Sequence, residues 1–322
     1  MISIGLVTYN SLPDLPPCLD SVQQQTWTDW RIVCLDNASQ DGTRTWLETH
    51  HLHPISSPIN AGYGRAHNHL IQISRLGDDD YYMPLNPDVI LSTSYLAALV
   101  DILRETGAGW ATGKLVQSNT QLLYSTGHAL LWHGYAFNIA FGLPDDERFA
   151  TPGEVFGAPG AAPLYSAAFV RRMIEQDGYF FDPDFFMYGE DVELDWRARR
   201  RGGRCWYTPY AVAFHRGSTP TTEMQIEAVG NRYLTAMRHT DHLPSLLIIM
   251  LGHCLLRVGV SPRLGLRLLW RLLRAMPGRI ASRRSGQDLG DWFAWSVQQP
   301  SAQPRTWSGR LLRFAQHWMM PL

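Results

Sequence analysis

Residues 185–202 read FFMYGEDVELDWRARRRG, and this stretch places four carboxylates within six positions: Glu190, Asp191, Glu193 and Asp195. Like charges so close together repel one another, so the acids either begin a solvated helix or take part in chemistry. Acidic side chains in the first turn of a helix are stabilised by the helix dipole, by about 0.3–1 kcal/mol each. That explanation does not account for the aromatic residues before them. A carboxylate buried beside Phe186 and Tyr188 would have a raised pKa and could act as a general base.

Further polar side chains follow strand-like segments near the start of the chain. Apolar runs at 2–7, 31–35, 54–56 and 81–85 alternate with helical patterns at 15–22, 41–49, the second half of NAGYGRAHNHLIQIS and 94–105. This alternation predicts an α/β fold with a mostly parallel sheet and helices on both faces. Right-handed crossovers bring the carboxyl ends of such strands to one edge, where ligands bind. The polar clusters at those ends are Thr8-Tyr9-Asn10, Asp36-Asn37 and Asn86-Pro87-Asp88.

The later part of the chain is less regular. Residues 107–185 show no clear periodicity, whereas 190 to about 201 predict a helix that Gly202-Gly203 ends. In that helix Glu193 lies four residues before Arg197, so we expect a surface ion pair worth about 0.3–0.5 kcal/mol. Residues 211–215 predict a further strand.

Three common α/β chemistries lack their motifs here. The chain reads VTYNSLPDL after its first strand, where dinucleotide-binding proteins have GxGxxG. The only lysine, Lys114, is followed by Leu115, so the sequence has no GxxxxGK[ST] phosphate loop. A GxSxG nucleophile elbow is also absent from the sequence.

Five motifs occur in a consistent order: VTYN, LDNASQDGT, NAGYGRAHN, LNPDV and FFMYGEDVELDWRARRRG. Together they resemble glycosyltransferase family 2, the inverting nucleotide-sugar enzymes with the GT-A fold, over residues 2 to about 233. The NPDV and FFMYGEDVELDWR forms are most similar to the rhamnosyltransferase-like subgroup, which builds bacterial cell-surface polysaccharide. The resemblance implies transfer of rhamnose or another hexose from a nucleoside-diphosphate donor to a glycan or lipid-linked acceptor.

The resemblance also implies roles for the acidic residues. Asp191 is the implied general base, with Glu190 beside it at the acceptor site and as the alternative base. Asp88 is implied to bind Mg²⁺ or Mn²⁺, a cation that stabilises the leaving diphosphate. The family's Asp-x-Asp motif has Asn86 in place of its first acid here, so metal affinity is expected to be modest. His215 is a further candidate ligand. The alternatives are a turn or cap role for Asp88 and a structural or acceptor-side role for His215.

The resemblance places the donor nucleotide among residues from the first strand ends. Asp36 would hydrogen-bond the base or ribose, with a turn acid as the alternative, and Gly62 would let the nucleotide approach the backbone. Asn60 could contact the ligand or form an Asx turn or helix cap. Arg65 could meet the diphosphate or be a solvated helix residue. The remaining residues assigned to the nucleotide sugar are Thr8, Tyr9, Asn10 and Asn86.

Charge is unevenly distributed along the chain. Residues 1–196 carry 9 basic residues against 24 acidic ones, whereas residues 197–322 carry 19 against 5. Within 257–284 there are eight arginines and no acid, and Arg267, Arg271 and Arg274 recur at helical spacing between Leu and Trp. This pattern predicts a basic amphipathic helix on an anionic membrane surface, and the alternative is a helix packed on the catalytic domain. Because the arginines alternate with apolar residues, nucleic acid is not expected as a partner.

The sequence therefore predicts a GT-A catalytic domain at 1–240 and a C-terminal basic helical region at 241–322. We expect a cytoplasmic protein without a signal peptide, peripheral on the inner face of the cell membrane, with buried free thiols. The apolar run at 246–256 is too short to span a bilayer. Two alternative functions remain: a catalytically degenerate scaffold at the membrane, and a sugar nucleotidyltransferase, although the Gly-rich N-terminal loop of that class is absent.

Overall fold

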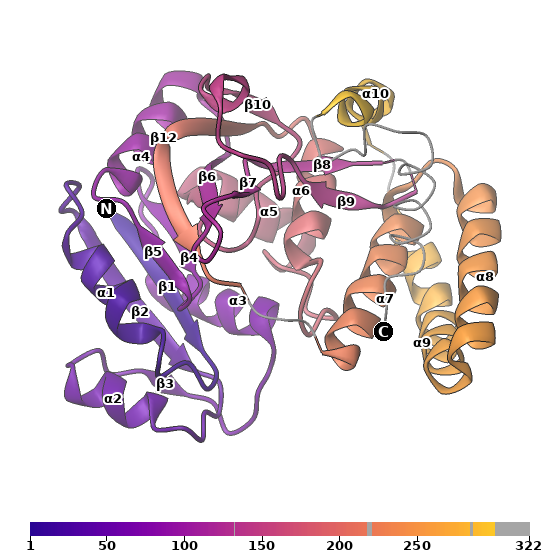
Figure 1. The fold of residues 1–322 in the computed structure, drawn as a ribbon, viewed down its shortest axis with the longest axis horizontal. Helices are drawn as coiled ribbons and strands as arrows, with labels where there is room; N and C mark the ends of the chain where they lie inside the picture. The colour runs from indigo at the N-terminus through magenta and orange to yellow at the C-terminus, as the bar shows by residue number, and fades with distance from the viewer. Residues whose placement is uncertain (132, 218–220, 284–285, 300–322) are drawn as a thin grey trace.

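The computed structural model describes residues 1–131, 133–217, 221–283 and 286–299. Its centre is a ten-stranded sheet with the order β10-β12-β6-β11-β4-β1-β2-β3, while β5 pairs with β12 and β7 with β6 (Figure 1). The strands are β1 (Ile2–Thr8), β2 (Trp30–Asp36), β3 (Ile55–Ser56), β4 (Tyr81–Leu85), β5 (Val89–Leu91), β6 (Trp110–Gln117), β7 (Leu123–Ser125), β10 (Gly153–Val155), β11 (Leu164–Ser166) and β12 (Cys205–His215).

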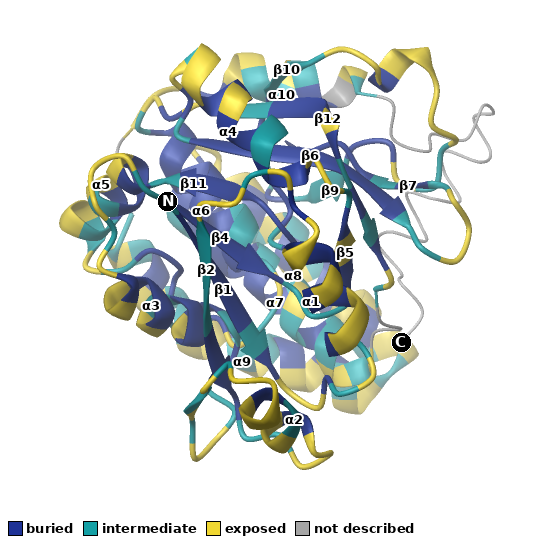
Figure 2. Cartoon of the chain, turned by 90° about the vertical axis from the view of Figure 1, so that its left-hand side faces the viewer, coloured by how far each residue is buried: buried dark blue, intermediate teal, exposed yellow. Residues whose placement is uncertain are grey.

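The parallel part of the sheet confirms the expected α/β architecture. β1 pairs in parallel with β2 and with β4, and β6 pairs in parallel with β12, whereas β11 runs antiparallel to both β4 and β6. The register places Thr8 opposite Asp36, so the polar clusters that follow β1 and β2 meet at one edge. The helices of this part are α1 (Leu15–Gln23), α2 (Thr43–Thr49), α3 (Tyr63–Ser74), α4 (Tyr95–Thr106), α5 (Ala167–Asp177) and α6 (Glu190–Arg199). Figure 2 shows buried strands between helices whose outer faces are exposed.

The middle of the chain, which has no periodicity in its sequence, contributes a central strand. β6 reads WATGKLVQ and lies between β11 and β12 in the sheet. Successive residues of β6 are buried, so both faces of the strand are covered and no alternation of polar and apolar residues is required. A Cβ at Gly113 would collide with the carbonyl oxygen of Ala211 on the neighbouring β12. The hairpin of β8 (His128–Leu130) and β9 (Ala136–Asn138) lies outside the large sheet.

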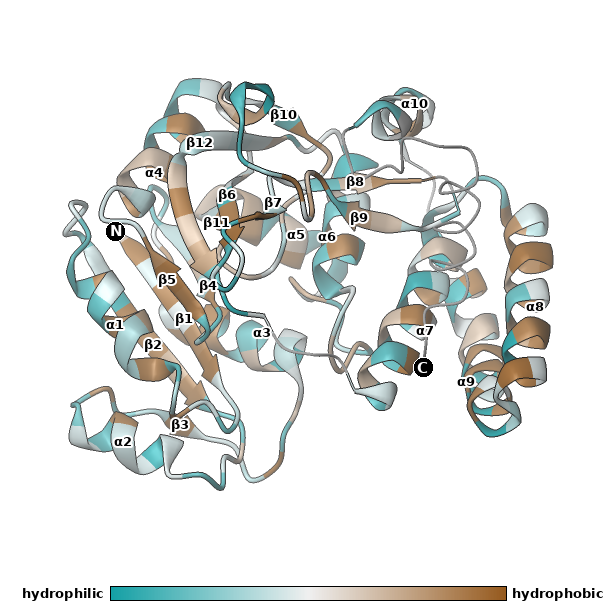
Figure 3. Ribbon diagram, in the orientation of Figure 1, coloured by the Kyte–Doolittle hydropathy of each residue, from teal (hydrophilic) through white to brown (hydrophobic). Residues whose placement is uncertain are grey.

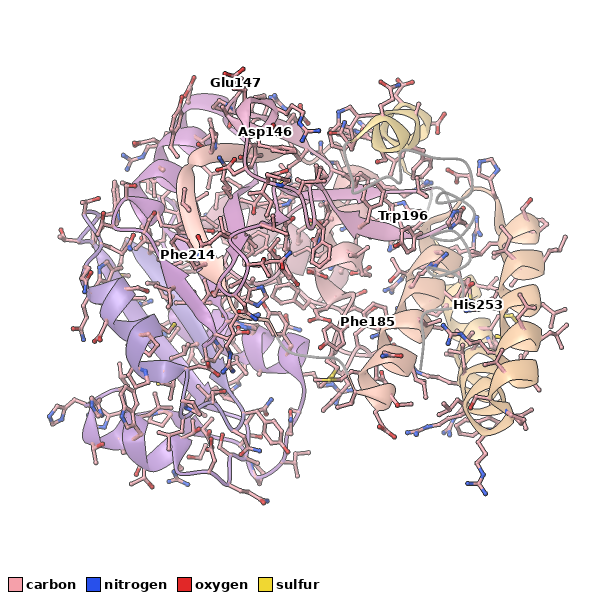
Figure 4. All side chains as sticks on the ribbon, viewed as in Figure 1. Asp146, Glu147, Phe185, Trp196, Phe214 and His253 are labelled. Carbon is pink, nitrogen blue, oxygen red and sulfur yellow. The ribbon has the colours of Figure 1, made fainter. Side chains whose placement is uncertain are left out.

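In the described ranges, four helices follow β12: α7 (Thr222–His239), α8 (Leu243–Val260), α9 (Pro262–Ala281) and α10 (Gly290–Gln298). Figure 1 shows α7 between the sheet and the α8–α9 pair. Their inner faces share one hydrophobic cluster with Phe185 and Trp196, both labelled in Figure 4 on the side of the sheet toward α7. Truncation before α7 or α8 would therefore expose part of this cluster to solvent.

α8 is more extensive than the apolar run at 246–256 suggested. It has 18 residues with a mean hydropathy of 1.9, and within the described ranges it is the one helix long and apolar enough to cross a membrane. Figure 3 shows its hydrophobic bands at the outer edge of the molecule. All four cysteines are buried and free, as expected.

Candidate active site

A cavity of about 710 Å³ opens where the carboxyl ends of β1, β2 and β4 meet the start of α6 and one face of α7. The hairpin β8–β9 and the segment 159–161 complete its wall. Eight of the residues expected from the sequence line this cavity: Tyr9, Asn60, Gly62, Asn86, Asp88, Glu190, Asp191 and His215. Residues separated by up to about two hundred positions in the chain are thus gathered around one space.

The acid pair begins α6 at the cavity wall. Tyr188 and Gly189 have left-handed backbone conformations with φ of 63° and 89°, which turn the chain sharply into the helix. The Asp191 carboxylate accepts hydrogen bonds from the backbone N–H of Gly160 (2.9 Å) and of Val192 (2.8 Å). Glu190 is only 7% exposed, and burial together with the neighbouring Asp191 raises the pKa of Glu190 to about 8. Its Oε2 has no hydrogen-bond partner among the described residues.

His128 lies behind Asp191 and was not anticipated from the sequence. Its Nε2 is 3.9 Å from Asp191 Oδ2, and its Nδ1 donates to Asp195 Oδ2 at 2.8 Å. Asp195 is fully buried and also accepts hydrogen bonds from Trp110 Nε1 and from the N–H of Ala158. Burial alone would lower the pKa of His128, but the two carboxylates outweigh it and raise that pKa. The imidazole therefore lies between two acids that are one turn apart on α6. The i,i+4 spacing of Asp191 and Asp195 was the one feature of the sequence that indicated a shared partner for these acids.

Asp88 and His215 form a second polar pair in the cavity. Antiparallel pairing of β5 with β12 sets His215 opposite Val89, and this places His215 Nε2 3.3 Å from Asp88 Oδ2. Burial alone would raise the pKa of Asp88, but its hydrogen bond to His215 and the charge of that ring outweigh burial and lower the pKa. His215 Nδ1 is buried and has no hydrogen-bond partner among the residues that the structure describes, and Tyr124 packs edge-on against the ring at 4.5 Å. Over the described part of the chain, no group of three or more His, Cys, Asp or Glu side chains is arranged to hold a metal ion.

The residues at the ends of β1 and β2 are partly engaged with one another. Thr8 Oγ1 donates to Asp36 Oδ1 at 3.0 Å, and Asp36 Oδ2 accepts from the N–H of Ser39, so this acid is 2% exposed and lies behind the cavity wall. Asn10 caps the N–H of Gln40 and lies outside the cavity lining. Tyr9 is half-exposed and lines the cavity. Thr8, Asn10 and Asp36 thus support the wall of the cavity at the ends of β1 and β2, but their side chains do not line it.

The NAGYGR segment chiefly holds the loop that leads to the acid pair. Asn60 Oδ1 accepts from Asn37 Nδ2 at 2.8 Å and from the N–H of Gly62, which is an Asx-type turn. A Cβ at Gly62 would collide with the Phe186 carbonyl, to which the N–H of Tyr63 donates. Gly62 is therefore required here because a larger side chain would collide with the loop at Phe186.

Arg65 is directed away from the cavity. Its Nε donates to the Pro183 carbonyl at 2.6 Å, so the guanidinium supports the same loop and does not line the cavity. Two roles for Arg65 were considered from the sequence. Its position outside the cavity lining favours the helix residue over the diphosphate contact.

Glu193 corrects an expectation from the sequence. It does pair with Arg197, at 3.0 Å, but its carboxylate is completely buried and also contacts His239 Nε2 at 3.0 Å and Arg238 at 3.7 Å. The helix period indicated the partner Arg197, whereas the burial comes from α7, which covers this side of α6 and supplies Arg238 and His239.

Comparison with known proteins identifies the family. The family model for glycosyl transferase family 2 matches residues 3–162, about half of the chain. An N-acetylglucosaminyl-diphospho-decaprenol L-rhamnosyltransferase of Mycobacterium tuberculosis is 26% identical over 270 residues, covering 74% of this chain and 85% of the relative. The low-salt glycan biosynthesis hexosyltransferase Agl10 of Haloferax volcanii is 26% identical over 237 residues, covering 72% of each protein.

A solved structure, GalNAc-T7 with UDP, GalNAc and Mn²⁺, superimposes with a TM-score of 0.61 at 14% identity. It covers 100% of this chain, whereas this chain covers 58% of that protein. The likeness supports the fold. The chain belongs to glycosyltransferase family 2, has the GT-A fold and is similar to rhamnosyltransferases of that family. It is a glycosyltransferase.

Proposed function

We propose that this glycosyltransferase moves a sugar, such as rhamnose, from a nucleoside-diphosphate donor to a lipid-linked or glycan acceptor with inversion at the anomeric carbon. The observation that carries the proposal is that Asp191 and the Asp88–His215 pair line the same cavity. A base and a diphosphate site in one cavity are what direct displacement at a sugar carbon requires.

In the proposed reaction Asp191 is the general base. The acceptor oxygen forms a bond to the anomeric carbon while the bond from that carbon to the diphosphate oxygen breaks. The hydroxyl proton passes to Asp191, and the nucleoside diphosphate leaves. The backbone N–H groups of Gly160 and Val192 orient the carboxylate. His128, held by Asp195, lies 3.9 Å from the Asp191 carboxylate, and the proton that its raised pKa favours would offset negative charge at this part of the cavity.

Asp88 and His215 would hold Mg²⁺ or Mn²⁺ on the donor diphosphate. The donor set suits such a cation, because a carboxylate oxygen and an imidazole nitrogen lie 3.3 Å apart and converge on the cavity. A bound cation would supply Lewis-acid stabilisation of the leaving diphosphate. Asn86 supplies no charge in this site, so diphosphate oxygens and water would complete the shell, and we expect weak binding of the cation without nucleotide.

The nucleoside would lie at the other end of the cavity, between Tyr9, Asn37 and Asn60. Tyr9 offers a half-exposed aromatic face, and the amides of Asn37 and Asn60 are hydrogen-bonded to one another at 2.8 Å. This arrangement supports a role for Thr8, Asn10 and Asp36 in shaping the nucleotide site from behind.

A membrane face on α8 and α9 is the second part of the proposal. On α8, Ile248, Leu251 and Leu255 are each at least half exposed and recur at i, i+3 and i+7; on α9, Leu266 and Trp270 are also more than half exposed and lie four positions apart. Isolated exposed apolar residues are ordinary, but a group of them on two helices that pack together, here called the apolar strip, suits an interface.

We commit to an anionic lipid surface as the occupant, because arginines border the apolar strip. Arg263 and Arg274 are exposed, and neither forms an ion pair with a carboxylate among the described residues. Arg267 pairs with Glu223 and Arg271 with Glu227 of α7, so part of the basic stripe joins the helices together. Anionic lipid attracts each remaining basic residue by about 1 kcal/mol. We therefore propose a catalytic domain at 1–240 and a membrane region at 241–322, of which residues 284–285 and 300–322 lie outside the described part of the chain, on the cytoplasmic side.

The test of function is sugar transfer by the full chain. Thermal shift with a panel of UDP-, dTDP- and GDP-sugars identifies the donor, since ligand at 100 times its Kd stabilises by roughly 2.7 kcal/mol. The selected donor is then incubated with lipid-linked acceptors and anionic vesicles, and the product is detected by mass spectrometry. Transfer with release of the nucleoside diphosphate supports the proposal. Nucleotide binding without transfer to any acceptor would favour the scaffold, and formation of a nucleotide sugar from a nucleoside triphosphate would indicate a nucleotidyltransferase.

A further inference from the structure

Arg232 is a cationic residue of the cavity wall that none of the functions above uses. It lies on the face of α7 that lines the cavity, together with Gln225, Ala228 and Thr235. Its guanidinium packs over the rings of Tyr135 at 4.8 Å and Tyr233 at 5.2 Å. Nη2 is 3.1 Å from His133 Nδ1, and Nε is buried with no hydrogen-bond partner in the described part of the chain.

This arginine differs from the others on the same side of the molecule. Arg197 and Arg238 are also largely buried, but they pair with Asp177, Glu193 and Asp182. In the described ranges of the chain no carboxylate forms an ion pair with Arg232. Burial lowers its pKa, and the two tyrosines only partly offset this effect. Partial burial of a cation beside neutral rings is costly unless an anion completes the site.

The position of α7 indicates which anion this is. The neighbouring Asn231 donates through Nδ2 to the carbonyls of Met187 (2.9 Å) and Tyr188 (2.6 Å), in the loop that leads directly to Glu190 and Asp191. On its other side α7 packs against α8 and α9, which carry the exposed apolar strip. α7, which carries Arg232 on its cavity face, thus lies between the cavity and the proposed membrane face.

We propose that Arg232 binds the phosphate group that joins the acceptor sugar to its lipid. This inference rests on the proposed function and specifies the acceptor class: a sugar carried on a lipid phosphate or diphosphate. The lipid would lie along α8 and α9, its phosphate at Arg232 and its sugar hydroxyl at Asp191. The donor diphosphate has its own site at Asp88 and His215. A guanidinium suits this task because its planar fork can donate two parallel hydrogen bonds to phosphate oxygens.

The test measures binding, so it does not depend on turnover. Geranyl diphosphate serves as a soluble prenyl diphosphate, and geraniol as its neutral counterpart. Titrations are made by calorimetry on the full chain, with Mg²⁺ and saturating nucleoside diphosphate (UDP, dTDP or GDP, whichever binds) to fill the donor site. Wild type should bind geranyl diphosphate and not geraniol. Arg232→Gln should weaken binding of geranyl diphosphate at least about tenfold, as expected for loss of one hydrogen bond between charged groups. Affinity for the nucleoside diphosphate should change less than about threefold, because that ligand binds elsewhere.

Two further variants control the result. Arg232→Lys keeps the charge but loses the fork, so it should recover part of the affinity for geranyl diphosphate. Arg44→Gln removes an exposed arginine of α2 that pairs with Glu48 outside the cavity, and it should leave both affinities unchanged. If Arg232→Gln fails to fold, the wild-type comparison still decides. A chain that binds geraniol as well as geranyl diphosphate, or neither of them, overturns the proposal.

Other outcomes also overturn the assignment. Equal affinity of wild type and Arg232→Gln for geranyl diphosphate would show that the guanidinium does not bind the lipid phosphate. An equal or larger loss of nucleoside diphosphate affinity would assign Arg232 to the donor. Failure of the proposed function would look different: the chain would transfer no sugar, while the binding difference at Arg232 could remain.

Discussion

The same chemical change at two positions of α6 should have two different effects. Asp191→Asn and Glu193→Gln each replace a carboxylate by an amide of nearly the same shape, two residues apart in the chain. Asp191 lines the cavity, whereas Glu193 is completely buried on the side covered by α7. We expect the first variant to lose turnover with only a small loss of stability, and the second to lose more stability and keep its turnover.

The magnitude for Glu193 follows from its partners. Its oxygens contact Arg197 Nε (3.0 and 3.1 Å) and His239 Nε2 (3.0 Å), and Arg238 lies 3.7 Å away. Removing one partner of a buried ion pair costs about 3–5 kcal/mol. Because Arg197 keeps Asp177 and an amide oxygen can still accept hydrogen bonds, we expect the lower end, about 3 kcal/mol. That loss corresponds to a Tm lower by roughly 5–10 °C.

The loss of stability should depend on pH. Burial alone would raise the pKa of Glu193, but Arg197, His239 and Arg238 outweigh it and hold the pKa well below its usual range. A depressed pKa stabilises the folded state above the unfolded pKa, near 4.3, and this contribution is lost as the pH falls further. The difference between wild type and Glu193→Gln should therefore be constant at pH 6–8 and shrink below about pH 4.5, measured by urea denaturation.

For Asp191→Asn, turnover should fall by about 10²–10⁴, as is typical for loss of a general base. Its Tm should fall by only about 2–4 °C, because the amide oxygen can still accept from one of the two N–H groups, Gly160 at Oδ2 or Val192 at Oδ1, and only the other hydrogen bond is lost. Single-turnover assays with saturating donor separate the chemical step from binding. Near wild-type transfer by Asp191→Asn, or a folded but inactive Glu193→Gln, would refute this reasoning and move the search for the base to Glu190.

Four further predictions follow from the site and its surroundings. The raised pKa of Glu190 means that the folded state holds an extra proton between about pH 4.5 and 8, so wild-type stability should fall across this window by at most about 1.4 kcal/mol per pH unit. Glu190→Gln should show a flatter dependence in urea denaturation; an unchanged slope would contradict the assignment. Asp88→Ala should abolish the tightening of nucleoside diphosphate binding by Mn²⁺ in calorimetry, and equal tightening in the variant would exclude Asp88 as a ligand. His128→Asn should lower turnover and shift the acidic limb of the pH–rate profile without changing nucleotide affinity, whereas a purely structural histidine would leave that limb in place. Ile248→Glu should stop sedimentation of the full chain with anionic vesicles at low salt without lowering Tm; persistent sedimentation would exclude the α8 face, and loss of a dimer in the variant would assign that face to a second copy.

The sequence predicted the α/β core because local patterns determine it. The bounds expected for β4 were correct, and those for β1, β2 and α6 were within about two residues, since buried parallel strands and helix-start acids have strong local signals. β6 was missed although it is central. It carries a glycine and a lysine, and its strand conformation comes from its neighbours β11 and β12.

The candidate site divides in the same way. Asp88, Glu190, Asp191 and His215 were candidates before the structure was known, because they follow strand ends or begin a helix and belong to motifs that resemble glycosyltransferase family 2. Which acids face ligand and which face the core depended on tertiary packing. Glu193 was expected at the surface, yet α7 covers it. No local pattern in α6 predicts that a helix beginning more than twenty residues later will pack against it.

His128 and Arg232 show what only the tertiary structure decided. His128 comes from a segment without periodicity, and its place between Asp191 and Asp195 arises when the β8–β9 hairpin packs beside α6. Arg232 looks in the sequence like any other arginine in a basic C-terminal half. The sequence by itself determined the residue types and their order. The packing of distant segments decided which charges are paired, which are buried and which face the cavity, because burial and electrostatic partners are properties of contacts between elements and not of spacing along the chain.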